Sequence, residues 1–207
     1  MSALPDLGFI HNYVPATDRT RPPLLLLHGT GGDENDLIPF GERLAPGAAL
    51  LSPRGKVLEH GAPRFFRRLA EGVFDQEDLA RRTLELIDFI DRARKTYNLA
   101  KPIALGFSNG ANIAASILLT QPRVLAGAVL LRAMIPFEPE KLPALDGLPV
   151  LMLSGIADPI VPASNRDKLA TLLATAGASL THEVVPSGHN LGPRDVALME
   201  SWLAEPR

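Results

Sequence analysis

Short apolar runs alternate with longer amphipathic segments along this chain, and this alternation constrains the possible folds more than any other feature. The runs are apolar at almost every position, are bounded by Gly, Pro or polar residues, and lie at residues 24–27, 48–51, 103–107, 126–131 and 150–153. Such runs suit strands that are buried on both faces of a parallel sheet. Weaker strand candidates lie at residues 9–14 and 180–185, the second nearer an edge of the sheet.

Helix patterns fill the intervals between these runs. In residues 75–97 the apolar residues form one stripe, and Asp75 is the predicted N-cap. Other helices are expected at residues 34–44 with Asp33 as N-cap, directly after Ser108, at residues 164–176 and from Pro193 onward. Alternating strands and helices predict an α/β fold with a doubly wound, mostly parallel sheet flanked by helices.

Length and composition limit the classes of protein to which the chain can belong. With 207 residues and no linker-like stretch, residues 1–207 are expected to form a single domain. The net charge of −2 argues against a general nucleic-acid binder. We find no cysteine, no recognisable signal peptide and no apolar run long enough to span a bilayer, so we expect a cytoplasmic protein without membrane insertion.

The pentapeptide Gly106-Phe107-Ser108-Asn109-Gly110 follows a predicted strand and opens a predicted helix. This is the G-x-S-x-G setting of a nucleophile elbow, in which a serine occupies a strained turn between strand and helix. Glycines two residues before and after the serine remove side chains that would clash in so tight a turn. The pattern predicts Ser108 as a catalytic nucleophile. The alternative is a Gly-rich turn whose serine caps the helix.

A serine hydroxyl needs a general base within hydrogen-bond distance, and in this fold such groups gather at the carboxyl ends of the strands. Asp158 and His189 each follow a predicted strand, and Ser108, Asp158, His189 is the chain order of α/β-hydrolase triads. We therefore predict that His189 is the base and that Asp158 orients it. The weaker candidates are Asp146, which precedes its strand, His182 inside a strand, His11 before the parallel sheet, and His60 in a long loop.

The four-leucine run ends in a glycine-rich loop, His28-Gly29-Thr30-Gly31-Gly32. Backbone amides in such a loop can face the serine, so we predict an oxyanion hole from the amides of Thr30 and Asn109, with Gly31 as the alternative to Thr30. The other interpretation is a phosphate-binding loop, but neither G-x-x-x-x-G-K-[ST] nor G-x-G-x-x-G is present. His28 is expected to brace the loop. The five histidines are scattered and cysteine is absent, so no metal and no cofactor are expected.

Several segments resemble a known family. They are LLLLHGTGGDENDL (24–37), SPRG (52–55), PRFFRRLAEGVFDQEDL (63–79), GFSNGANIAAS (106–116), GIADPIVP (155–162) and SGHNL (187–191). Together they resemble the carboxylesterase, phospholipase and acyl-protein thioesterase branch of the α/β-hydrolase superfamily. The PRFFRR and GFSNGAN segments are most similar to small bacterial hydrolases linked to hydroquinone and quinone stress. The resemblance implies a serine hydrolase with Ser108, Asp158 and His189 as its triad.

The resemblance also implies that the PRFFRR segment borders the substrate pocket. The residues expected to line that pocket are Phe65, Phe66, Arg64, Met134, Ile160 and Val161. Two interpretations stay open for Arg64, Arg67 and Arg68, which either bind an acidic group of the substrate or form a salt-bridged surface. The short interval between residues 133 and 150 leaves no room for a lid domain, so we expect a shallow, open site.

The predicted function is that of a serine carboxylesterase-type hydrolase, which cleaves small carboxylic esters through an acyl-enzyme intermediate. An acyl thioesterase or lysophospholipase would use the same triad and differ in its pocket. A non-catalytic ligand sensor on a hydrolase fold is the alternative from another class. The expected partner is a small-molecule ester, and the chain is expected to be a monomer or a homodimer.

Overall fold

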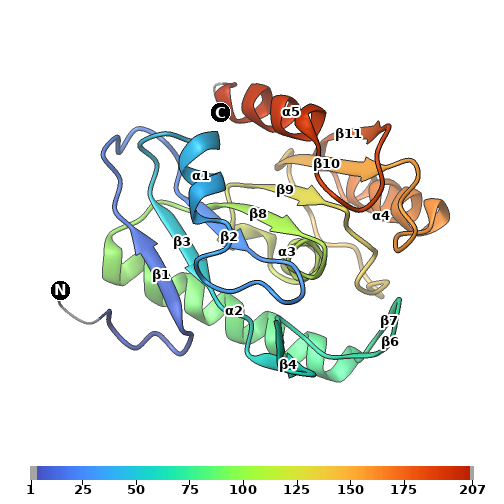
Figure 1. Ribbon diagram of the computed structural model, residues 1–207, viewed down its shortest axis with the longest axis horizontal. Coiled ribbons are helices and arrows are strands. Elements are labelled where there is room, and N and C mark those ends of the chain that lie inside the picture. Colours follow the sequence, from blue (N-terminus) through green and yellow to red (C-terminus); the bar gives the residue numbers. More distant parts are fainter. Residues whose placement is uncertain (1–3, 206–207) are drawn as a thin grey trace.

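A central sheet of seven strands organises the computed structural model, which describes residues 4–205. The strands lie in the order β1-β3-β2-β8-β9-β10-β11. Their bounds are β1 (His11–Val14), β2 (Leu24–Leu27), β3 (Leu50–Pro53), β8 (Ile103–Phe107), β9 (Gly127–Leu131), β10 (Pro149–Gly155) and β11 (Ser179–Val185). β1 pairs antiparallel with β3, and the other neighbours pair in parallel. The predicted mostly parallel, doubly wound sheet is thus confirmed (Figure 1).

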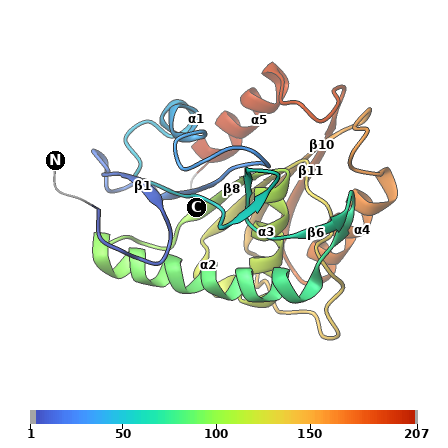
Figure 2. The same ribbon diagram turned by 60° about the horizontal axis from the view of Figure 1, so that its bottom comes forward.

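Helices cover both faces of the sheet. α1 (Ile38–Leu44) and α5 (Pro193–Ala204) lie on one face, and α2 (Gln76–Tyr97), α3 (Asn109–Thr120) and α4 (Ala163–Thr175) lie on the other (Figures 1 and 2). Leu24 and Leu26 pack into the core under α1 and α5, whereas Leu25 and Leu27 pack into the core under α2, α3 and α4. Because side chains alternate along a strand, a run of four leucines fills both layers at once.

Three predicted elements begin two or more residues later than expected, and one of them is the strand placed at residues 9–14, which begins at His11. The helix placed at residues 34–44 begins at Ile38, and the Asp33 carboxylate instead accepts the Asn35 amide in the preceding turn. Pro39 sets this start, because proline fits the first turn of a helix but clashes in its interior. The strand placed at residues 48–51 begins at Leu50, where pairing with both Leu24 and Val14 starts.

Two small hairpins occupy residues 57–74, where a long loop was expected. They consist of β4 (Val57–Glu59), β5 (Ala62–Arg64), β6 (Arg68–Ala70) and β7 (Val73–Phe74), and a short 3-10 turn, η1 (Pro122–Val124), follows α3. His60 and Gly61 form the first hairpin turn, both with positive φ (51° and 85°). Two residues in this conformation make the tight turn whose twist matches paired strands. His60 therefore lies at a hairpin turn.

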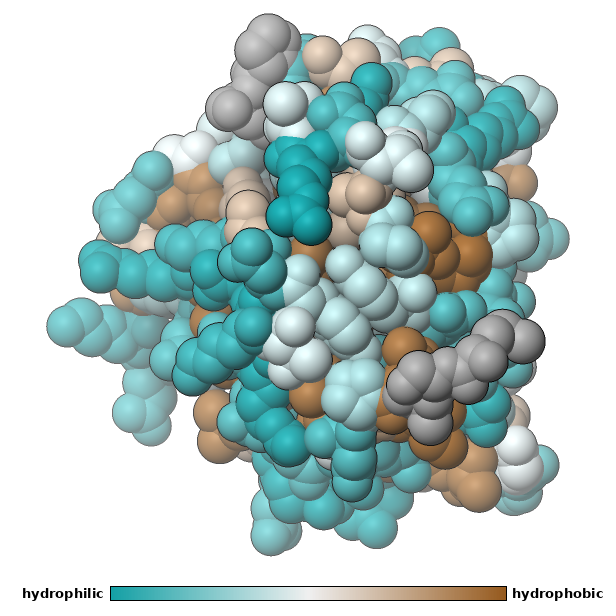
Figure 3. All heavy atoms as spheres, turned by 90° about the vertical axis from the view of Figure 1, so that its left-hand side faces the viewer, coloured by the Kyte–Doolittle hydropathy of each residue, from teal (hydrophilic) through white to brown (hydrophobic). Residues whose placement is uncertain are grey.

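The connection between β9 and β10 is short and irregular. Residues 132–148, between β9 and β10, form neither helix nor strand, consistent with a fold that has no lid domain. Viewed from the side of β1, the surface is mainly hydrophilic, with separate hydrophobic patches (Figure 3). None of the helices within residues 4–205 combines the length and apolar character needed to cross a membrane.

Two leucines of α2 provide a matched test of this packing. Leu86 is fully buried, whereas Leu84 on the opposite side of the helix is 58% exposed. We expect Leu86→Ala to lower the free energy of unfolding by about 2–5 kcal/mol, because it removes buried contacts and leaves a cavity. Leu84→Ala should change it by less than about 0.5 kcal/mol. Urea denaturation of both variants measures the difference, and equal losses would contradict the packing described here.

Candidate active site

The turn at Ser108 has the strained geometry of a nucleophile elbow. Ser108 has φ 51° and ψ −114°, a backbone conformation that is uncommon for a residue with a side chain. A Cβ at Gly106 would lie 2.5 Å from the Gly110 carbonyl oxygen, and a Cβ at Gly110 would overlap the Leu27 carbonyl. The two glycines are therefore needed because strand, turn and helix approach one another too closely for side chains.

Three side chains from separate loops form a hydrogen-bonded chain at the carboxyl ends of β8, β10 and β11. His189 Nε2 lies 2.9 Å from Ser108 Oγ, and His189 Nδ1 lies 2.8 Å from Asp158 Oδ2. With Nδ1–H donating to the carboxylate, Nε2 is left to accept from the serine hydroxyl. The structure thus brings together the three residues that the sequence analysis combined. This arrangement can move a proton off the hydroxyl.

The Asp158 carboxylate is held by more than the histidine. Its Oδ1 accepts hydrogen bonds from the amides of Ile160 (2.8 Å) and Val161 (3.1 Å), and its side chain is only 1% exposed. These bonds leave Oδ2 free to accept from the imidazole. The Asp158 loop therefore fixes both the position and the rotation of the carboxylate.

The loop after β2 lies beside the serine, because Thr30 and Ser108 line the same cavity. The amide of Gly31 already donates to the Pro63 carbonyl (3.0 Å), so Gly31 does not fit the role of alternative oxyanion donor. Among the described residues, the amides of Thr30 and Asn109 donate to no other protein group. These two amides are therefore the available pair for an oxygen bound at Ser108.

His28 links this loop to the neighbouring strand ends. Its Nδ1 donates to the Gly29 carbonyl (2.6 Å), and its Nε2 accepts from the Gly55 amide (3.0 Å). The ring is almost fully buried and lies against Phe65. Burial lowers the pKa of His28, and the accepting Nε2 likewise requires the neutral ring. The expectation that His28 braces the loop agrees with these contacts.

A buried ion pair holds the loop that carries His189. Arg132, 1% exposed, pairs with Asp195 at the start of α5 (2.8 Å). Its guanidinium also donates to the carbonyls of Gly188 (3.0 Å) and Asn190 (3.1 Å), on either side of the histidine. Both carboxylate oxygens of Asp195 accept from the guanidinium. Because burial removes water as a competitor, the ion pair fixes this loop to the sheet and to α5.

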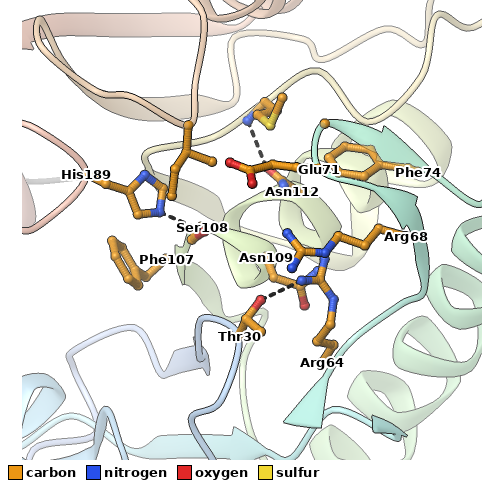
Figure 4. Close-up of a pocket in the computed structure, with 13 residues that line it drawn as sticks. Thr30, Arg64, Arg68, Glu71, Phe74, Phe107, Ser108, Asn109, Asn112 and His189 are labelled. Carbon is orange, nitrogen blue, oxygen red and sulfur yellow. Dashed lines mark hydrogen bonds between the residues drawn. The ribbon is translucent and has the colours of Figure 1, made fainter. Parts of the chain in front are cut away.

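A cavity of about 340 Å³ opens at Ser108. It is lined by Thr30, Arg64, Arg68, Glu71, Gly72, Phe74, Phe107, Ser108, Asn109, Asn112, Met134, Ile160 and His189. Arg64, Met134 and Ile160 are thus placed on its wall, as expected for a pocket there. Ser108 and His189 lie on one side of this cavity, and Arg64 and Arg68 lie on the other (Figure 4).

Three of the predicted lining residues lie elsewhere. Phe65 and Phe66 are 2% and 0% exposed and pack into the core, where Phe66 contacts Phe74 edge to face. Val161 is also buried, and its amide donates to Asp158. We therefore correct the expectation that these side chains form the apolar wall. Adjacent residues of an extended segment point to opposite sides, so Arg64 can reach the cavity while Phe65 enters the core.

The sequence analysis missed five lining residues and left the role of a sixth open. Five were not singled out at all, namely Glu71, Gly72, Phe74, Phe107 and Asn112, and Arg68 was left without an assigned position. Phe107 and Asn112 flank the elbow, one residue before the serine and one helical turn after it, so their spacing could have indicated them. The others depend on the unexpected β6–β7 hairpin.

The weaker catalytic candidates lie away from this cavity. His182 lies within β11 and contacts Ser154 Oγ (3.1 Å), and His11 contacts the Tyr97 hydroxyl (2.7 Å). Asp146 lies in the turn before β10. Within residues 4–205, no group of three or more His, Asp or Glu side chains is arranged to hold a metal ion.

Comparison with known proteins identifies a family and several relatives that this chain resembles. A family model described as phospholipase/carboxylesterase matches residues 11–205. MhqD of Bacillus subtilis (strain 168) is 47% identical over 184 residues, which are 88% of this chain and 92% of that protein. The Bacillus cereus carboxylesterase is similar in structure with a TM-score of 0.92 and 44% identity, covering 95% of this chain and 93% of its own. The structure of YahD with malic acid is similar with a TM-score of 0.88 and 32% identity, and the match covers 94% of this chain and 98% of YahD.

The sheet, the elbow and these similarities define an α/β-hydrolase of the esterase type. The chain belongs to the phospholipase/carboxylesterase family. The fold class and the family that the sequence motifs indicated are confirmed.

The neutral state of His28 gives a pH-dependent contribution to stability. Its folded pKa lies below the usual 6.5, so on acidification the unfolded chain binds the proton first and the free energy of unfolding falls. This contribution is fully present above about pH 6.5 and is lost as the pH drops below that value. We expect the stability gap between wild type and His28→Gln to narrow between about pH 8 and about pH 5. Denaturant titrations measure it, and a gap that widens would contradict the assignment.

Arg132 and Arg43 provide a matched pair of arginines for the buried clamp. Arg132→Met should lower the free energy of unfolding by about 3–5 kcal/mol, because Asp195 would be left buried without its partner. Arg43 pairs with Glu200 on the surface and its side chain is 64% exposed. Arg43→Met should therefore cost about 1 kcal/mol or less. Guanidinium denaturation compares the two, and similar losses would show that the buried pair has no special role.

Proposed function

We propose that this family member is a serine esterase that hydrolyses small carboxylic esters through an acyl-enzyme intermediate. The observation that carries the proposal is the continuous hydrogen-bond chain from Ser108 Oγ through His189 to Asp158. The cavity at that serine supplies a place for the ester, and its moderate volume suits a small acyl group.

In the proposed mechanism, His189 Nε2 takes the hydroxyl proton while Ser108 Oγ bonds to the ester carbonyl carbon. The carbonyl oxygen gains negative charge and accepts hydrogen bonds from the amides of Thr30 and Asn109. The protonated histidine then gives its proton to the leaving alcohol as the ester C–O bond breaks. A water molecule, activated by the same histidine, releases the acid and regenerates the serine.

Asp158 acts on the reaction through His189. Its Oδ2 accepts from Nδ1–H, which selects the tautomer with an accepting Nε2 and stabilises the imidazolium that forms. The amides of Ile160 and Val161 keep the carboxylate in place during both steps.

Asp158→Asn should leave the fold intact and reduce turnover by about four orders of magnitude.

Esters of small organic acids belong among the substrates to test. The relative YahD was determined with malic acid, a compound with two carboxyl groups. An ester panel of increasing acyl length also separates the proposal from a thioesterase or lysophospholipase, for which the rate would rise steeply with chain length. The cytoplasmic location and the monomeric or dimeric state stay predictions.

Labelling with a fluorophosphonate probe tests the nucleophile. The wild type should be labelled and should hydrolyse p-nitrophenyl acetate, whereas Ser108→Ala should lose both properties. Ser154 is the matched control, because it also contacts a histidine but lies outside the cavity and its His182 has no paired carboxylate among residues 4–205. Ser154→Ala should keep both properties. Labelling that survives Ser108→Ala would overturn the proposed function.

A further inference from the structure

The three neighbouring arginines of residues 64–68 take different directions. Arg67 points away from the cavity and pairs with Asp75 (2.6 Å), and its side chain is 63% exposed. Arg64 and Arg68 line the cavity, and their guanidinium groups lie next to each other beside Asn109 (Figure 4). The two interpretations of this cluster therefore apply to different members: Arg67 belongs to the surface, and the other two belong to the site.

Arg64 is a buried charge that the protein only partly satisfies. It is 3% exposed. Its Nε donates to the Phe66 carbonyl (3.3 Å) and pairs with Glu59 (3.3 Å), and its Nη1 donates to Thr30 Oγ1 (2.7 Å). Within the described part of the chain, Nη2 has no acceptor. Burial lowers the pKa of Arg64, the nearby Arg68 charge acts in the same direction, and Glu59 opposes both. A second anion beside Arg64 would be stabilising.

Arg68 and Asn109 add two further donors at the same place. Arg68 uses Nε and Nη2 for Glu59, and its Nη1 has no acceptor among residues 4–205. Asn109 Oδ1 accepts from the Phe65 amide (2.7 Å), which fixes the orientation of the side-chain amide. Its Nδ2 is buried without a hydrogen-bond partner. The guanidinium groups of Arg64 and Arg68 thus share the single carboxylate of Glu59. Three nitrogen donors, Arg64 Nη2, Arg68 Nη1 and Asn109 Nδ2, lack acceptors among the described residues. A cluster of cationic and neutral donors with too few acceptors is suited to bind a further carboxylate.

The position of this cluster relative to His189 decides which part of an ester it contacts. Figure 4 shows Ser108 between His189 on one side and Arg64 and Arg68 on the other. In the proposed reaction the leaving alcohol receives its proton from His189 Nε2, so that alcohol lies on the histidine side. The acyl chain therefore extends toward the two arginines.

We infer that the cluster formed by Arg64, Arg68 and Asn109 Nδ2 binds a carboxylate on the acyl part of the substrate, so that the preferred substrates are monoesters of dicarboxylic acids. This inference rests on the proposed function. Ser108 Oγ bonds to the ester carbonyl carbon, the alcohol leaves with the histidine proton, and water then releases the free dicarboxylic acid. The second carboxylate stays unchanged and only positions the acyl group.

Glu71 is the remaining charged group on the cavity wall. Its carboxylate lies at the exposed end of the β6–β7 hairpin, on the side of Asn112 and away from the guanidinium groups (Figure 4). Water screens a charge in such a position far more than it screens the buried Arg64. The field at the arginine side of the cavity is therefore positive.

Matched esters test the inference. The substrates are the monoethyl esters of succinic, glutaric, adipic and suberic acid, each compared with the ethyl ester of the corresponding monoamide. The carboxamide has nearly the shape of the carboxylate but no charge. We expect kcat/KM to be about ten- to a hundredfold higher for the best carboxylate than for its carboxamide, because charge-assisted hydrogen bonds to buried donors are strong. The preference should weaken with added salt.

Arginine variants test which side chains cause the preference for the carboxylate over the carboxamide. Arg68→Gln and Arg64→Gln should reduce the carboxylate-to-carboxamide ratio of kcat/KM at least about tenfold. Arg67→Gln, whose side chain faces Asp75, should leave that ratio unchanged. Because Arg64 is buried and its replacement can impair folding, the half-exposed Arg68 decides the test if Arg64→Gln does not fold.

The outcomes separate this inference from the proposed function. Fluorophosphonate labelling at Ser108 without a carboxylate preference, or with a preference that survives Arg68→Gln, overturns the inference and leaves the esterase proposal intact. A preference that appears only when the carboxylate is on the alcohol, as in the hexanoyl ester of glycolic acid, overturns the acyl-side assignment. Absence of labelling overturns both.

Discussion

The contact between the start of α3 and the ends of β2 and β8 is the constraint on which the rest of the site depends. Gly106 and Gly110 allow backbone to pack directly on backbone, and Ser108 is held between them with a positive φ. The same contact brings the loop after β2 beside the serine, so Thr30 and Ser108 line one cavity. A side chain at either glycine would push the start of α3 away from the ends of β2 and β8.

Polar contacts to backbone groups hold the loops that meet at this edge of the sheet, in addition to the packing of Val161 into the core and of His28 against Phe65. Arg132 fixes the His189 loop, two amides fix the Asp158 carboxylate, and His28 connects the Thr30 loop to Gly55. Loops at a site must remain open to a ligand and cannot be buried under side chains. Buried hydrogen bonds to backbone groups give them a defined position without closing the cavity.

The hairpins at residues 57–74 give the cavity its chemical character. The proposed triad and the two proposed donor amides lie at the sheet edge, and they are the parts expected of a serine hydrolase in general. The hairpins add Arg64, Arg68, Glu71 and Phe74 to the cavity wall, so part of its charge and shape comes from the segment between β3 and α2. The cavity is therefore built from two parts of the chain, the ends of the sheet strands and the hairpins at residues 57–74.

The sequence by itself determined the mostly parallel sheet, the alternation of strands and helices along the chain, and the three residues Ser108, Asp158 and His189 that the structure joins by hydrogen bonds. These features follow from local patterns: fully apolar runs, the glycines of the elbow, and acid and base residues directly after strands. Helix and strand starts were misplaced where one proline or one pairing partner decided them, at Pro39 and Leu50. Only the tertiary structure decided that Phe65 and Phe66 enter the core while Arg64 and Arg68 face the cavity. The reason is that the direction of a side chain in a short hairpin depends on register and on packing against distant residues such as Asn109, Asp78 and Phe74, which no local pattern records.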